Sequence, residues 1–289
     1  MKELGGKKAV VTGGALGIGL STCKRLVRQG VSVTIWDMNE KCMAEAKSEL
    51  ESMGGTVFTY KCDVSDKNLV EELTLQARKD MGRIDILVNN AGYVRWGNFW
   101  ERPVEEAIRQ FDVNVNAIFY TIHAILPEMI DRNSGHIVNI SSSAGFVNSP
   151  GLTAYCASKA AVHMLTECLR VEAIAAGKNG VKFSSVHPIN IAKGMFEGYS
   201  TNALGKLLFP PIKDHDVIAE AIVNDALLKE ITVVCIPKIA YASWMMRGVI
   251  PNFIWDKMLM ALGFGEGVKN FQGRKGFAHT DSSADKTGC

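Results

Sequence analysis

Short apolar runs rich in β-branched residues alternate with helix-like segments along most of this chain. The runs that we expect to be strands cover residues 8–13, 31–37, 56–63, 84–89, 136–140, 181–187 and 231–236. Apolar runs of this length are typical of parallel strands buried on both faces, and parallel strands need a crossover connection between them. The alternation therefore predicts an α/β protein in which helices cover both faces of a parallel sheet.

The segments between these runs carry the signals of helix ends. Gly30 follows the first helical segment at a position where glycine commonly ends a helix. We expect Ser65 to cap a helix that Gly82 ends, and Pro103 to begin a long helix that continues past Ile125. Further helices are expected over 20–29, up to about 53, over 152–176 and over 214–229.

The charge balance and the cysteine pattern argue against several kinds of partner. The formal net charge is +2 over 289 residues and the basic residues do not cluster, so we expect no nucleic-acid partner. The seven cysteines are scattered without a Cys-x-x-Cys pair, and we expect no metal site. No signal peptide fits before the first strand, and no apolar run reaches the ~20 residues of a membrane-spanning helix. We therefore expect a cytoplasmic protein.

A glycine-rich turn joins the first strand to the first helix. Gly13, Gly17 and Gly19 lie in it, with Leu16 and Ile18 between them. Glycine lets a backbone approach a pyrophosphate closely, and the helix N-terminus supplies a positive partial charge. We expect these five residues to bind a dinucleotide; the alternative is a plain tight turn.

Acidic residues end the second and third strands. Asp37 can accept hydrogen bonds from both ribose hydroxyls and would repel a 2′-phosphate. No arginine or lysine stands at Met38 or at turn positions 14–15 to receive such a phosphate, so NAD is preferred over NADP. Asp63, followed by Val64, can reach the adenine amino group. The alternatives are a strand-end turn for the first acid and a helix-entry role for the second.

Tyr155 and Lys159 lie four positions apart, so both fall on one face of the predicted helix. An ammonium there favours the tyrosinate and lowers the pKa of the tyrosine toward working pH. Such a tyrosine can exchange a proton with a substrate oxygen. Taken alone, the pair is a weak signal, because Tyr-x-x-x-Lys occurs by chance on many helix surfaces and then means only a partly exposed tyrosine beside a solvated lysine.

Four motifs together resemble the short-chain dehydrogenases/reductases in order and spacing, over about residues 7–237. They are Thr12-Gly13-x-x-x-Gly17-x-Gly19, Asn89-Asn90-Ala91-Gly92, Ser142 and Tyr155-x-x-x-Lys159. The resemblance implies a single doubly wound Rossmann domain with a seven-stranded sheet in three α/β/α layers. It also implies cofactor and substrate at the carboxyl ends of the strands, and a homodimer or homotetramer.

The resemblance assigns catalytic roles by position. Tyr155 matches the general acid/base, and Lys159 matches the residue that binds the nicotinamide ribose and lowers the tyrosine pKa. Ser142, which has serines on both sides, matches the residue that orients the substrate oxygen. Asn114 matches a residue that holds a water in a proton relay to Lys159, with Asn116 as the competing assignment.

Further cofactor contacts follow from the same resemblance. Asn90, Ala91 and Gly92 match a cofactor-binding turn, in which Asn90 contacts a ribose or, alternatively, braces the turn. Pro188 and the backbone of Ile191 match contacts to the nicotinamide end.

The segment after the sixth strand departs from the family pattern. Ile189 replaces a glycine, and Lys193 replaces the threonine that usually holds the carboxamide.

Local strings narrow the resemblance to one branch. They are Gly194-Met195-Phe196-Glu197-Gly198, Ser142-Ser143-Ala144-Gly145, Tyr155-Cys156-Ala157-Ser158-Lys159 and the Pro210-Pro211 turn. They are similar to the epidermal-type retinol dehydrogenases and the lipid-droplet 17β-hydroxysteroid dehydrogenases. That group implies a lipophilic alcohol or its carbonyl as substrate: a retinoid, a steroid or a long-chain alcohol.

The expected domain organisation has three parts. Residues 1–238 form the dinucleotide-binding and catalytic domain, with a substrate loop at about 194–213. Residues 239–265 extend that domain with apolar and aromatic residues, and residues 266–289 form a polar, flexible tail. The stretch 239–264 can pack in a subunit interface or touch a membrane or lipid droplet. We predict that it lines or covers an apolar pocket, because the substrate loop precedes it.

Two other functions remain open from the sequence. One is a short-chain dehydrogenase for a small polar alcohol or an acyl carbonyl. The other is a catalytically silent NAD-binding protein of a lipid-droplet or membrane surface.

Overall fold

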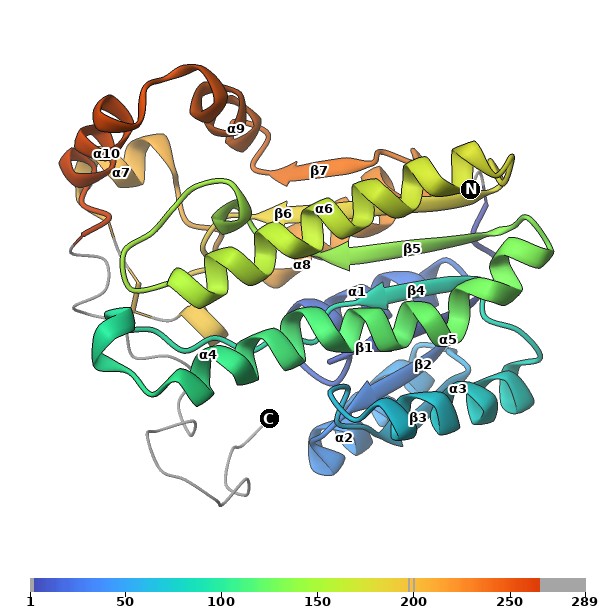
Figure 1. The fold of residues 1–289 in the computed structure, drawn as a ribbon. Helices are drawn as coiled ribbons and strands as arrows, with labels where there is room; N and C mark the ends of the chain where they lie inside the picture. The colour runs from blue at the N-terminus through green and yellow to red at the C-terminus, as the bar shows by residue number, and fades with distance from the viewer. Residues whose placement is uncertain (1–2, 197, 200, 266–289) are drawn as a thin grey trace.

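A computed structural model describes residues 3–196, 198–199 and 201–265. Seven parallel strands form one sheet in the order β3-β2-β1-β4-β5-β6-β7 (Figure 1). The strands are β1 Lys8–Thr12, β2 Ser32–Asp37, β3 Val57–Lys61, β4 Ile86–Asn89, β5 Gly135–Ile140, β6 Val181–Pro188 and β7 Val233–Ile236. The predicted doubly wound α/β fold is confirmed.

Helices cover both faces of the sheet. They are α1 Gly17–Arg28, α2 Glu40–Ser52, α3 Lys67–Met81, α4 Val104–Phe111, α5 Ala117–Asp131, α6 Thr153–Ala175, α7 Ala203–Leu208, α8 His215–Ala221, α9 Ala240–Val249 and α10 Asn252–Ala261. Two π-helical segments, η2 Asp112–Asn116 and η5 Ile222–Leu228, continue α4 and α8, and short 3₁₀ turns lie at η1 Phe99–Glu101, η3 Ser143–Gly145 and η4 Gly194–Phe196. One core lies between the sheet and α3, α5 and α6, and a second lies on the side of α1, α2 and α8.

The continuous apolar runs are explained by these two cores. In β1, Ala9 and Val11 belong to the core beneath α1, whereas Val10 between them belongs to the core beneath α3. Successive side chains of a strand point to opposite faces, so a strand in the middle of three layers must be apolar at every position.

The strand order places a crevice beside β1. The chain winds outward through β2 and β3 on one side of β1, and through β4 to β7 on the other. Loops that leave the carboxyl ends of β1 and β4 therefore diverge, and ligands of doubly wound sheets bind where the order reverses in this way.

Two boundary predictions were wrong. The cap of α3 is Asp66, whose side chain accepts the N–H groups of Asn68 and Leu69, while Ser65 donates its hydroxyl to Asp63 instead. The long helix expected from Pro103 is interrupted by η2.

The extension 239–265 forms α9 and α10, which lie beside α7 at the carboxyl end of the sheet (Figure 1). The predicted tail, 266–289, lies outside the described residues. Within the described ranges, no helix is both long and apolar enough to cross a bilayer.

Candidate active site

A cavity of about 830 Å³ opens at the carboxyl ends of the strands. Its walls come from the turn after β1, the ends of β2 to β6, the start of α6 and the segment between β6 and α8. All the residues predicted to bind the cofactor or to catalyse line this cavity, apart from Gly19 and Asn114, which lie behind its wall. In the described part of the chain, no cluster of three or more His, Cys, Asp or Glu residues could hold a metal ion.

The glycine turn brings the start of α1 to the cavity. Gly13 and Gly17 have φ angles of 62° and 57°, a region that favours glycine. A Cβ on Gly19 would lie 2.1 Å from the Gly13 carbonyl oxygen, so the turn cannot close over a larger residue. No described side chain caps α1 at Leu16, and its first turn holds no acidic residue. Its first N–H groups are thus suited to an anion such as a pyrophosphate.

Asn90 links the turn after β4 to the glycine turn after β1 by hydrogen bonds. Its side-chain amide donates to the carbonyl oxygens of Thr12 and Gly13, both at 3.0 Å. The backbone N–H groups of Asn90 and Ala91 donate to the Thr12 hydroxyl. This geometry supports the bracing role for the Asn90 amide, since both its protons are engaged by the glycine turn.

The two acids at the strand ends differ in their partners. The Asp37 carboxylate accepts the N–H groups of Ala15 and Asn39, each at 3.1 Å, so it is held against the glycine turn at the edge of the cavity. Asp63 accepts a hydrogen bond from Arg109 at 3.0 Å and two from Ser65. Burial raises the pKa of Asp63, but these hydrogen bonds outweigh burial and hold the pKa below its usual range.

Tyr155 and Lys159 are both buried, with exposed fractions of 5% and 4%. The Lys159 ammonium lies 5.7 Å from the centre of the Tyr155 ring and donates to the Ile140 carbonyl oxygen at 2.8 Å. Ser142 follows β5, and its side chain lies close enough to Tyr155 to lower the pKa of that tyrosine. The structure thus brings the predicted serine, tyrosine and lysine together on one wall of the cavity.

The predicted effect of Lys159 on Tyr155 was wrong. Burial raises the pKa of Tyr155 well above its ordinary value, and the neighbouring Ser142 side chain lowers it only in part. Burial also lowers the pKa of Lys159 from 10.5 to about 8. Sequence spacing shows that the two side chains share a helix face, but it does not show how far each is removed from water, and here desolvation is the larger effect.

Asn114 is completely buried in the π-helical segment η2. Its side chain accepts the Tyr93 N–H at 2.8 Å and donates to the Tyr93 carbonyl oxygen and to Ser158. The competing residue, Asn116, donates instead to Asp112 of its own helix. Of the two, Asn114 faces the catalytic helix.

Gly92 lies between Asn114 and Lys159. A Cβ at this glycine would stand 3.5 Å from Asn114 Oδ1 and 3.9 Å from Lys159 Nζ. The two side chains therefore flank one narrow space, whose width depends on the absence of a side chain at Gly92.

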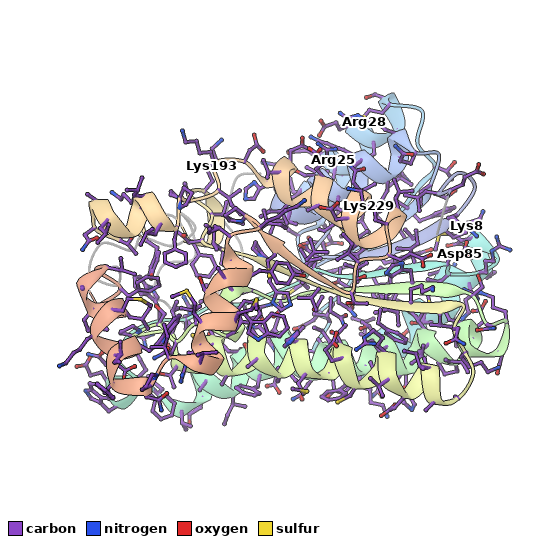
Figure 2. The ribbon with its side chains drawn as sticks, turned by 90° about the horizontal axis from the view of Figure 1, so that it is seen from above. Lys8, Arg25, Arg28, Asp85, Lys193 and Lys229 are labelled. Carbon is purple, nitrogen blue, oxygen red and sulfur yellow. The ribbon has the colours of Figure 1, made fainter. Side chains whose placement is uncertain are left out.

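The segment after β6 differs from the family pattern in two ways. Ile189 is buried, so its side chain packs in the core. The strand-like bridge between Ile191 and Ile212 uses the Ala192 N–H and the Asn190 carbonyl, which leaves the N–H and carbonyl of Ile191 directed away from that bridge. Lys193 is exposed at the rim of the cavity, and Figure 2 shows it at the opposite end of the molecule from Lys8.

The apolar extension covers the cavity only in part. Ala240, Ser243 and Phe264 line it, which bears out the predicted lining role for these residues. Trp255 and Leu259 are buried against Val147 of the loop that follows η3. Many of the other apolar side chains of α9 and α10 face outward.

Sequence reasoning missed a polar group behind Ser142, of which two members are buried and His163 is half-buried. It consists of His163, Ser185 and His187. A signal for one member existed, because His163 follows Lys159 at the same four-residue spacing that links Lys159 to Tyr155.

Comparison with known proteins agrees with this geometry. A family model described as short chain dehydrogenase matches residues 7–203. Epidermal retinol dehydrogenase 2 of Mus musculus is 34% identical over 277 residues, which are 95% of this chain and 88% of the relative. Retinol dehydrogenase 10 of Homo sapiens is 30% identical over 275 residues, with 86% of this chain and 80% of the relative covered.

Solved structures give the same result. A short chain dehydrogenase/reductase from Burkholderia phymatum in complex with NAD has a TM-score of 0.76 and 26% identity, covering 86% of this chain and 95% of that structure. An NAD⁺-bound xylitol dehydrogenase has a TM-score of 0.71 and 27% identity, with coverages of 81% and 99%.

Proposed function

The chain belongs to the short-chain dehydrogenase family, and from this premise we propose that it is an NAD-dependent oxidoreductase for lipophilic alcohols and their ketones or aldehydes. One observation carries the proposal: the Ser142 and Tyr155 hydroxyls share the wall of a cavity that also holds the glycine turn and is otherwise largely apolar. The family resemblance inferred from the motifs is confirmed, including its retinol dehydrogenase branch.

The catalytic roles are proposed from the positions of the side chains. During oxidation of the alcohol, Tyr155 gives its own phenolic proton to the path through Lys159 and takes the hydroxyl proton of the substrate in its place; in the reverse reaction the phenol gives its proton to the carbonyl oxygen. Ser142 holds the same substrate oxygen by a hydrogen bond, which is worth most as charge develops there. Lys159, whose pKa lies at about 8, passes the proton on toward the space beside Asn114.

The cofactor site is proposed to take NAD, which when bound supplies the hydride acceptor at nicotinamide C4. The first N–H groups of α1 would receive the pyrophosphate, and Asp37 the adenosine ribose. Asp63 and Val64 would lie beside the adenine. Ile191 would offer its N–H and carbonyl to the carboxamide, because the threonine usual at position 193 is a lysine here.

The lining of the cavity supports a lipophilic substrate. The apolar side chains that face it come from four separate segments and include Val94, Trp96, Val147, Leu152, Met195, Phe196, Phe209 and Phe264. Removal of such surface from water on binding favours an apolar ligand by ~25 cal/mol per Å². A small polyol would leave most of this surface uncovered.

Two surfaces support proposed contacts beyond the substrate. Apolar side chains are exposed on the neighbouring helices α4, α5 and α6, at Val104, Ile108, Phe119, Met164, Val171 and Ile174, and these support a homodimer. A second exposed group lies on α7, α9 and α10, at Leu204, Leu207, Leu208, Met245, Met246, Val249, Phe253, Ile254 and Met260, and supports a peripheral membrane or lipid-droplet contact. Sedimentation and vesicle co-flotation test the two contacts separately.

The test of the proposed function is a panel of retinoid, steroid, long-chain and small polar alcohols, with NAD and NADP in parallel. We expect NADH to appear with at least one lipophilic alcohol and not with the polyols. Turnover with the polyols alone would replace the substrate class, and binding of NADH without turnover of any alcohol would favour the catalytically silent protein.

A further inference from the structure

The Ser142 side chain is held only loosely by its own contacts. Its hydroxyl accepts the Ala144 N–H at 3.2 Å, and its distance to the Pro188 carbonyl oxygen is 3.4 Å, which is long for a hydroxyl hydrogen bond. Ser142 also lies outside regular structure, between β5 and η3. A substrate-orienting hydroxyl needs a fixed position, so the backbone of Ser142 must be held by something else.

Two groups hold the Ser142 carbonyl oxygen: the Gly145 N–H of the local turn, at 2.9 Å, and His187, which reaches it from the neighbouring strand. His187 lies in β6 and is completely buried, and its Nδ1 is 3.2 Å from the Ser142 carbonyl oxygen. A carbonyl can only accept, so Nδ1 carries the proton and Nε2 must act as an acceptor. The Ser185 hydroxyl, 2.8 Å from Nε2, supplies the hydrogen that this tautomer requires.

The chain of contacts continues to the catalytic helix. The Ser185 oxygen lies 3.4 Å from Nδ1 of His163, which is in α6 one turn beyond Lys159. Since Ser185 donates its only hydroxyl hydrogen to His187, His163 must be the donor in its contact with Ser185, and this 3.4 Å contact is the weakest of the three. The contacts from His163 to Ser185, from Ser185 to His187 and from His187 to Ser142 therefore link the helix that carries Tyr155 to the backbone of Ser142.

Aromatic rings close this group off. The Phe146 ring lies 4.7 Å from the His187 ring, and Trp244 of α9 stacks on Phe146 at 5.4 Å and meets His163 edge-on at 5.3 Å. Burial, helped by the charge at His163, lowers the pKa of His187 to about 3, so its ring is neutral at working pH. A neutral ring keeps one donor and one acceptor, which is what its two contacts need.

We propose that His187 is a positioning residue that fixes Ser142 relative to Tyr155 through the hydrogen-bonded chain His163, Ser185, His187. The proposal rests on the proposed function, because the reaction requires the Ser142 and Tyr155 hydroxyls to contact the same substrate oxygen. His187 touches neither substrate nor cofactor, and it acts through the position of the Ser142 backbone.

The decisive comparison is between two substitutions of His187. His187→Phe keeps a ring against Phe146 but removes both hydrogen bonds, and we expect kcat to fall ~100-fold with KM changed by less than about threefold, as for a small misplacement of a catalytic group. His187→Asn keeps an amide donor near the position of Nδ1, and we expect it to recover at least about a tenth of wild-type kcat.

His136 supplies a matched control. It is also completely buried, and its ring is 2.9 Å from the hydroxyl of Ser184, but it lies at the start of β5, far from Ser142 along that strand. His136→Phe should lower the melting temperature and leave kcat of the folded protein near the wild-type value. If His187→Phe does not fold, Ser185→Ala takes its place. It removes the hydroxyl between His163 and His187 and keeps both imidazole rings, and we expect its kcat to fall about tenfold.

Each outcome decides the proposal. A folded His187→Phe variant with wild-type kcat would overturn the proposal. If His187→Phe does not fold, wild-type kcat in Ser185→Ala would overturn it instead. So would equal losses of kcat in the His187→Phe and His136→Phe variants, or no recovery with His187→Asn. Absence of turnover in the wild-type protein would instead count against the proposed function.

Discussion

Replacement of Lys159 by methionine should stabilise the protein at neutral pH. Lys159 is buried, and burial lowers its pKa from 10.5 to about 8. Because one pKa unit corresponds to ~1.4 kcal/mol, the protonated lysine costs the folded state about 3 kcal/mol. Loss of the hydrogen bond to the Ile140 carbonyl offsets ~1 kcal/mol of this, so Lys159→Met should gain about 2 kcal/mol in free energy of unfolding.

The pH dependence gives the sharper form of this prediction. Below pH 8 the lysine is protonated in both the folded and the unfolded states, and the full cost applies. Between pH 8 and 10.5 the unfolded state binds more protons, so the stability of the wild-type protein rises with pH. The advantage of Lys159→Met should therefore shrink by about 3 kcal/mol across that window.

Urea unfolding of the cofactor-free protein at pH 7 and pH 10, at one protein concentration, measures this difference. Lys41→Met, at an exposed position of α2, controls for the change of residue type. A Lys159→Met variant that is less stable than wild type at pH 7, or whose advantage is the same at both pH values, would refute the reasoning.

Three further predictions concern the cofactor and the proton path. Asp37→Ala should weaken NAD binding about tenfold and improve NADP binding, because the carboxylate that would repel a 2′-phosphate is gone; cofactor titrations that show an unchanged ratio would contradict this. Asn114→Leu should lower kcat more than tenfold, whereas Asn116→Leu should not, since only Asn114 faces α6; equal kcat values for the two variants would reverse that assignment. Gly19→Ala should abolish NADH binding, because its Cβ would meet the Gly13 carbonyl oxygen at 2.1 Å, while Gly248→Ala, which meets nothing within 4 Å, should bind NADH normally.

The parallel sheet and its helical layers could be predicted from the sequence, because they rest on a strong local pattern. A strand such as β1 must be apolar on both sides to sit between two cores, and its letters show this directly. The sequence does not decide which residue caps α3, since Ser65 and Asp66 are both good N-cap residues. The structure shows that the Ser65 hydroxyl donates to Asp63 and that Asp66 is the cap. The π-helical turn at η2 leaves no such pattern.

The catalytic residues also divide into features that local spacing predicts and features that only the three-dimensional structure shows. Spacing placed Tyr155 and Lys159 on one face, but their pKa values depend on burial, which no local spacing reports. His187 and Ser142 are 45 positions apart in the chain and meet only because β5 and β6 are neighbours in the sheet. Residues that act across strands in this way become visible once the strand order is known.

The most direct test of the account is the substitution Tyr155→Phe. It removes the one hydroxyl proposed to exchange a proton with the substrate and leaves the ring, its burial and its edge contact with Phe196 in place. With a lipophilic alcohol that the wild-type protein oxidises, we expect kcat to fall ~10³-fold or more while the NADH dissociation constant stays within about twofold. Turnover close to the wild-type rate, with NADH binding intact, would contradict the proposed chemistry.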